Sequence, residues 1–106
     1  MQLINVEEEM LIYSLRYGLG RHTYCTAIIC ENIISNLDKL SLKTLYVIAR
    51  DITEFLTRAI DSQVDSEINN IDNRAWSNLL KVISEKLPEY FFIDYPQVLS
   101  IINRFI

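Results

Sequence analysis

The only histidine of the chain lies in a short segment that also holds two arginines and both glycines, RYGLGRHTY at residues 16–24. Because glycine readily ends a helix, the segment predicts a turn between two helices. If Thr23 caps the second of these helices, Arg21 and His22 lie at its positive end. A cation is unfavourable there unless a negative group is close. The segment therefore predicts a compensating anion.

Two sources of negative charge fit this segment. One is internal, because Asp51 borders an apolar stripe further along the chain and could pair with Arg16 or Arg21. The other is external, because the backbone N–H groups at a helix start could hold a phosphate or carboxylate together with the basic side chains. The sequence leaves both readings open. The candidate binding residues are Arg16, Tyr17, Arg21, His22, Thr23, Tyr24 and Asp51.

A second polar segment, DSQVDSEINNIDN at residues 61–73, carries the acidic residues Asp61, Asp65, Glu67 and Asp72. Its alternating acids suggest a calcium loop, but Asn70 stands where that loop needs glycine and Trp76 where it needs glutamate. The composition is typical of a solvated loop. The alternative is an acidic surface used by a protein partner.

Motifs that would indicate catalysis are missing from the sequence. It contains no glycine-rich phosphate loop, no HExxH, no paired CxxC and no GxSxG. His22 and Cys25 could share a helix face, but two ligands do not make a zinc site, and a Cys–His nucleophile would lack an orienting partner. We therefore expect no enzymatic activity, no metal and no cofactor.

Length and charge narrow the class of protein further. With 106 residues, half of them hydrophobic, the chain predicts one domain over residues 1–106. A net charge of −4 disfavours general binding to nucleic acid or to an anionic membrane. No apolar run approaches the roughly 18 residues of a membrane span, and the acidic N-terminus lacks the pattern of a signal peptide. The expected location is cytoplasmic, with Cys25 and Cys30 reduced.

Helical spacing of apolar residues predicts an all-α fold of about five helices. The first begins near Asn5 with Glu8 as a capping-box partner, carries Met10, Tyr13 and Tyr17 at helical spacing, and ends at the glycines. The second begins at Thr23 and is apolar on nearly every side, so we expect it to be central and buried. The third is capped by Ser41 and runs to about residue 60.

Two further helices are predicted after the acidic segment. Asp72 or Asn73 caps the fourth, which Pro88 ends. The aromatic run EYFFID at residues 89–94 lacks a helical period and predicts a short extended connector. Pro96 suits the first turn of a last helix, which docks on the core.

The segment RYGLGRHTY, followed some twenty residues later by LKTLYVIARDI, resembles small helical proteins encoded on phages, prophages and plasmids of low-GC Gram-positive bacteria. Those proteins share an Arg-Tyr-small-Leu-Gly-Arg-x-Thr-Tyr motif and a Thr-Leu…Arg-Asp-Ile segment. The resemblance covers about residues 10–55 and implies a mobile-element context. The matching positions are Arg16, Tyr17, Leu19, Gly20, Arg21, Thr23 and Tyr24, then Thr44, Leu45, Ile48, Arg50, Asp51 and Ile52.

Three functional hypotheses follow. The first is a small acidic interaction protein of a phage or mobile element that binds and inhibits a host protein, for example a defence nuclease. The second is an anion-binding module in which Arg16, Arg21 and His22 hold a nucleotide or a nucleic-acid phosphate. The third is a homo-oligomer, suggested by an apolar C-terminus and by Val47 on the solvent side of the third helix.

Overall fold

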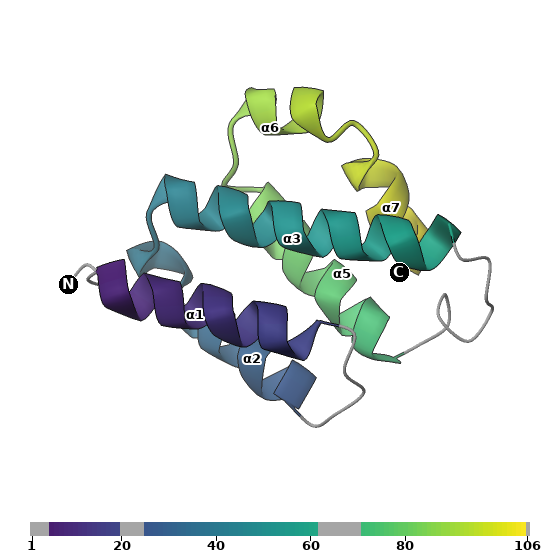
Figure 1. Ribbon diagram of the computed structural model, residues 1–106. Coiled ribbons are helices and arrows are strands. Elements are labelled where there is room, and N and C mark those ends of the chain that lie inside the picture. Colours follow the sequence, from purple (N-terminus) through teal and green to yellow (C-terminus); the bar gives the residue numbers. More distant parts are fainter. Residues whose placement is uncertain (1–4, 20–24, 62–70, 106) are drawn as a thin grey trace.

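The computed structural model describes residues 5–19, 25–61 and 71–105 of the chain. Within these ranges the protein is helical and contains no strand, so the all-α prediction is confirmed (Figure 1). The described residues form six helices, one more than expected, together with a short 3₁₀ turn. They are α1 (Asn5–Gly18), α2 (Cys25–Ser35), η1 (Leu37–Lys39), α3 (Leu42–Asp61), α5 (Ile71–Ser84), α6 (Glu89–Asp94) and α7 (Val98–Phe105).

The helix at the centre of the structure is α5. It contacts α2, α3 and α7, and in Figure 1 it passes behind α3. Trp76 and Leu80 of α5 are almost completely buried, and they join a single hydrophobic core to which every helix contributes. A helix contacted from several sides needs apolar residues around most of its surface. α5 meets that condition only in part, because its buried side includes Asn73 and Ser77 besides the apolar residues, and Arg74 and Lys81 face solvent.

The prediction that the second helix is central and buried is wrong. In α2 one face is buried, including Ile29 and Ile33, whereas Ile28 is 57% exposed and Ile34 is 47% exposed. The sequence pattern overstated the burial of this helix because only α1, η1 and α5 contact it substantially among the described elements. Two isoleucines consequently face solvent.

The apolar stripe predicted on the first helix also faces solvent rather than the core. Met10, Tyr13 and Tyr17 are 64%, 73% and 52% exposed, whereas Leu15 of the same helix is fully buried. The helix carries two apolar stripes, and the aliphatic one occupies the core. Tyrosine tolerates the outer position because its ring ends in a hydroxyl that can meet water.

The predicted extended connector at residues 89–94 is instead the helix α6. It begins directly after Pro88, whose carbonyl accepts the N–H of Phe91, and the Phe91 carbonyl accepts the N–H of Tyr95. Phe91 is fully buried, and its ring lies 5.1 Å from those of Tyr46 and Tyr95. Packing of this aromatic cluster outweighs the weak helical period of the run.

The remaining boundaries differ from expectation by a few residues, since α5 ends at Ser84 rather than at Pro88 and α7 begins at Val98 rather than at Pro96. Ser41 caps α3, because its Oγ accepts the backbone N–H of Thr44 at 3.2 Å. α5 begins at Ile71, slightly before the predicted cap, so Asp72 lies in its first turn and Asn73 is buried within it. α7 docks on the core through four buried residues, namely Val98, Ile101, Ile102 and Phe105.

Gly18, the last residue of α1, permits a close approach between helices. It is buried, and a Cβ atom at this position would lie 2.5 Å from Cδ1 of Ile29 and 3.5 Å from the ring of Trp76. We expected Gly18 to adopt a left-handed turn conformation, but glycine stands here because a residue without a side chain fits against Ile29. A methyl group at residue 18 would occupy space that the Ile29 side chain fills.

This contact predicts a specific double-mutant cycle. Gly18→Ala should change the free energy of unfolding by less than about 1 kcal/mol, because the cost of displacing Cδ1 of Ile29 offsets the gain in helix propensity. Ile29→Val removes Cδ1 and should make room for the new methyl group. Urea denaturation of the two single variants and the double variant should therefore show that the double variant loses less stability than the sum of the singles. Simple additivity would contradict this account of Gly18.

Candidate functional site

Asp51 of α3 holds Arg16 of α1 in an ion pair. Nε of Arg16 lies 2.7 Å from Oδ2 of Asp51, and Nη2 of the neighbouring Arg50 lies 3.3 Å from Oδ1. The Asp51 side chain is only 12% exposed, whereas that of Arg16 is 55% exposed. Of the two readings that the sequence left open, the internal ion pair is thus the one observed for Arg16. It joins α1 to α3.

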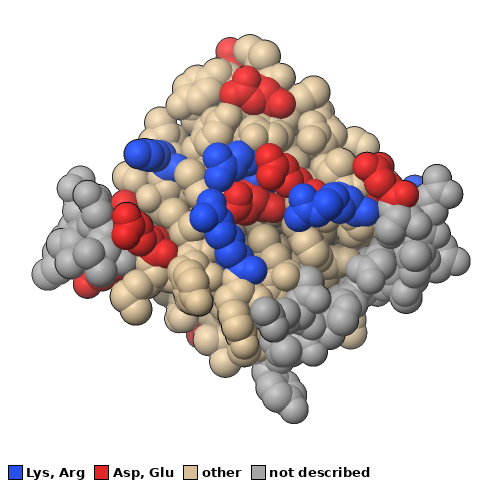
Figure 2. All heavy atoms as spheres, viewed as in Figure 1, with Lys and Arg blue, Asp and Glu red and all other residues tan. Residues whose placement is uncertain are grey.

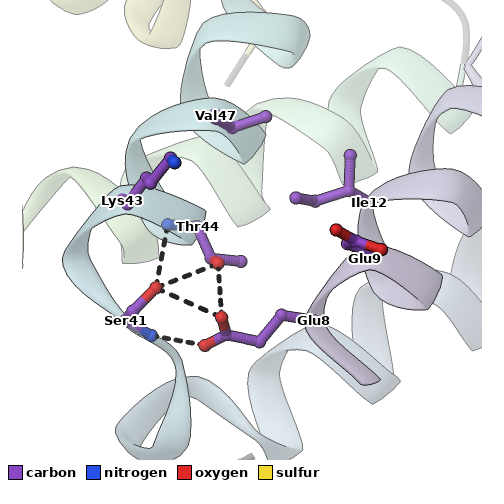
Figure 3. A pocket seen from close by; sticks show the side chains of 7 residues that line it. All are labelled: Glu8, Glu9, Ile12, Ser41, Lys43, Thr44 and Val47. Atoms are coloured by element: carbon purple, nitrogen blue, oxygen red, sulfur yellow. Dashed lines mark hydrogen bonds between the residues drawn. The ribbon is translucent and has the colours of Figure 1, made fainter. Parts of the chain in front are cut away.

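Glu8 of α1 makes a second connection, at the first turn of α3. Its carboxylate accepts the backbone N–H of Ser41 at 2.8 Å and the hydroxyl of Thr44 at 3.0 Å. The Ser41 hydroxyl lies within hydrogen-bonding distance of both Glu8 and Thr44, and Figure 3 shows the three side chains converging. Glu8 is 8% exposed, so its charge is largely shielded from water and satisfied by the helix start.

This arrangement is a capping box whose acid comes from another helix. In the usual box, the third residue of the helix is a Glu or Gln that accepts the N–H of the cap residue. In α3 that third residue is Thr44, and Glu8 accepts the Ser41 N–H in its place. Sequence reasoning had assigned Glu8 to its own helix, as a partner of Asn5. The missing acid at residue 44 was the available signal that Ser41 needs an acceptor from elsewhere.

The two connections together fix how α1 lies on α3. Glu8 meets the start of α3 and Arg16 meets its middle, so the two helices run in the same direction. Between them lies a cavity of about 280 Å³, with Ile12 and Val47 on opposite walls in Figure 3. Glu9 and Lys43 also line it. The cavity is therefore apolar in the middle and charged around the edge.

The Glu8 connection predicts a stability change with a matched control. Glu8→Ala should lower the free energy of unfolding by about 1–3 kcal/mol, because the Ser41 N–H and the Thr44 hydroxyl lose a buried acceptor. Glu9→Ala removes the adjacent, exposed carboxylate and should change stability by less than about 0.5 kcal/mol. Guanidinium denaturation of both variants measures the difference. Equal losses would contradict a capping role for Glu8.

A second hollow lies between α1 and α2, on the side of α1 that faces away from the core. It has a volume of about 410 Å³ and is mainly apolar. We call it the α1–α2 groove, and its lining residues are Tyr13, Ser14, Tyr17, Cys25, Ile28, Ile29 and Asn32. Tyr13, Tyr17 and Ile28 are each more than half exposed. Contiguous exposed apolar surface of this kind is typical of interaction sites.

Tyr17 is the one predicted binding residue that lines this groove among those the structure describes. Arg16 precedes it on α1 but pairs with Asp51 on α3. Sequence reasoning missed Tyr13 and Ile28 as surface residues, because their spacing is equally typical of a core stripe. The exposed tyrosines in place of Leu or Ile were the signal for an outward face.

The two cysteines of the chain differ in accessibility. Cys25 is half-buried at the edge of the groove, whereas Cys30 is buried and its Sγ lies 3.9 Å from the Ala75 carbonyl oxygen. Burial, together with the nearby charge of Asp72, raises the pKa of the Cys30 thiol to about 11. Neither cysteine is part of a disulfide.

This difference predicts selective labelling. At pH 8 the Cys30 thiol stays protonated because its pKa lies about three pH units higher, and only the thiolate reacts with disulfide reagents. An aromatic disulfide reagent should therefore modify Cys25 much faster than Cys30 in the folded protein. Cys25→Ser should remove the fast phase and Cys30→Ser should leave it. Similar rates for the two thiols in folded protein would contradict the placement of Cys30.

The other predicted site residues are only partly described. Asp61 is exposed at the end of α3, and Asp72 is half-buried in the first turn of α5. Residues Arg21, His22, Thr23 and Tyr24, and the acidic residues Asp65 and Glu67, lie outside the described residues. The proposed external anion site and most of the proposed acidic surface therefore stay predictions.

Comparison with known proteins gives no assignment. The chain matches no protein-family model, no curated protein and no solved structure. In the described ranges, no helix has both the length and the apolar character of a membrane span. No group of three or more His, Cys, Asp or Glu side chains is placed to hold a metal ion in residues 5–19, 25–61 and 71–105.

Proposed function

We propose that this chain is a small non-enzymatic interaction protein of a phage or other mobile element, acting in the host cytoplasm by binding and inhibiting a host protein. The observation that carries the proposal is the α1–α2 groove, where two tyrosines and an isoleucine stay exposed around an apolar hollow. The likeness of RYGLGRHTY to proteins of mobile elements supports the context. Tyr17 belongs to both that motif and the groove.

The groove favours a partner that presents apolar side chains ringed by hydrogen-bonding groups. Tyr13 and Tyr17 offer large apolar rings with hydroxyls, and such residues often dominate binding energy at protein interfaces. Ile28 lies on the α2 side of the same hollow. An apolar helix or strand edge with hydrogen-bonding groups at its rim fits these features.

The anion-binding alternative is less well supported at Arg16. Its Nε faces the carboxylate of Asp51, so an internal partner already balances its charge. A phosphate ligand would have to compete with that contact. Binding dominated by phosphate would also weaken steeply with salt, whereas an apolar protein interface would not.

The test is capture of a host protein by a tagged chain, with variants in the groove. Tyr13→Ala/Tyr17→Ala should weaken the captured protein's binding at least about 30-fold, since interface tyrosines contribute about 1–2 kcal/mol each. Tyr90→Ala is the matched control, because Tyr90 of α6 is 52% exposed, as Tyr17 is. The lysate should come from a low-GC Gram-positive bacterium and be treated with nuclease. Affinities are then measured by calorimetry with the purified partner.

Each result separates the hypotheses. One protein bound near 1:1 by the wild type and by Tyr90→Ala, but lost by the groove variant, supports the proposal. Equal binding by both variants would place the interface elsewhere and contradict it. Capture of nucleic acid alone, abolished by nuclease, would favour the anion-binding module instead.

A further inference from the structure

The solvent side of α3 carries a stripe of residues with alternating spacings of four and three, the spacing of a coiled-coil seam. We call it the α3 stripe, and its members are Lys43, Val47, Arg50, Glu54, Thr57 and Asp61. All six are exposed or half-exposed. Figure 2 shows basic and acidic side chains side by side along this face of the molecule. The stripe runs along the whole helix, about 30 Å at the usual rise per residue.

The charges of the stripe are self-complementary. In the N-terminal half of the stripe, the basic residues Lys43 and Arg50 flank Val47. In the C-terminal half, the acidic residues Glu54 and Asp61 flank Thr57. A second copy lying antiparallel on the first would place Lys43 opposite Asp61, Arg50 opposite Glu54, and Val47 opposite Thr57. Each position therefore meets an opposite charge or an uncharged small residue. We propose that the α3 stripe is the interface of an antiparallel homodimer with two-fold symmetry.

A cavity on the same face supports this arrangement independently. Arg58 lies one heptad after Asp51, so it projects from the edge of α3 that faces α1. In a dimer whose two-fold axis is perpendicular to α3, this edge of one copy faces the α1 side of the other copy. Arg58 of one copy then lies opposite residue 46 of the other. The 280 Å³ cavity between α1 and α3 lies there, with the exposed carboxylate of Glu9 in its lining. Arg58 of the second copy would thus lie near the carboxylate of Glu9, in a hollow that Lys43 also lines.

The interface differs from the α1–α2 groove in its residues and in its chemistry. Four of the six positions of the stripe are charged, so association should be modest and sensitive to salt. Dimer formation needs no other partner and can be measured on the purified chain. The dimer proposal and the proposed host interaction can therefore succeed or fail separately.

The experiment is sedimentation velocity on wild-type protein and on two charge-reversed variants. Wild type should form dimers of the 12.4 kDa chain at low ionic strength and dissociate in about 1 M salt, where charges are screened within about 3 Å. Arg50→Glu and Glu54→Arg each place like charges opposite one another twice per dimer. Each variant alone should raise the dissociation constant by more than about tenfold.

Mixing the two variants provides the decisive measurement. In a heterodimer of Arg50→Glu with Glu54→Arg, both contacts join opposite charges again, so an equimolar mixture should dimerise more tightly than either variant alone. Lys81→Glu, an exposed reversal on α5, is the control and should dimerise like wild type. Circular dichroism verifies that the variants are folded. A monomeric wild type, a single variant that dimerises as tightly as wild type, or a mixture that dimerises no better than the single variants would each overturn the proposal.

Discussion

The structure depends first on a buried carboxylate at the start of its longest helix. Glu8 supplies the acceptor that the first turn of α3 lacks in its own sequence, and it does so from α1. A helix start exposes unsatisfied N–H groups and a partial positive charge, so a nearby carboxylate both satisfies and neutralises it. The contact also prevents Glu8 from being buried without partners. One interaction therefore completes α3 and fixes where α1 begins on it.

The Arg16–Asp51 pair gives this placement its direction. Glu8 of α1 binds the start of α3, and Asp51 of α3 binds Arg16, which lies about two turns after Glu8 on α1. An ion pair as exposed as Arg16 adds little stability by itself. Combined with the Glu8 contact, it distinguishes a parallel pairing from an antiparallel one. With α1 turned over, both acids would lose their partners. The rotation of α1 then leaves Tyr13 and Tyr17 on the outside.

Sequence alone indicated the helices well and the surfaces poorly. The α3 boundaries and the Ser41 cap were predicted because a long amphipathic stripe and a capping serine act locally. The outward face of α1 was not predicted, because Met10, Tyr13 and Tyr17 recur at the spacing that is also typical of a core stripe. Only tertiary packing decides which of two apolar stripes is buried. α6 was missed for the same reason, because its helix depends on Phe91 packing against residues far along the chain. Asp51 was correctly singled out as a partner for Arg16.

The parallel pairing of α1 and α3 also has a consequence for how the chain is made. Glu8 and Thr44 are 36 residues apart, so α1 cannot complete its contacts by forming a hairpin with its neighbour. During synthesis at about 5–20 residues per second, α1 emerges from the ribosome roughly 2–7 seconds before the residues that bind it. For that interval Glu8 and Arg16 lack their partners on α3, and α2 is the neighbour against which α1 can pack. The pairing of α1 with α3 is thus completed only after α2 and the first half of α3 have been made.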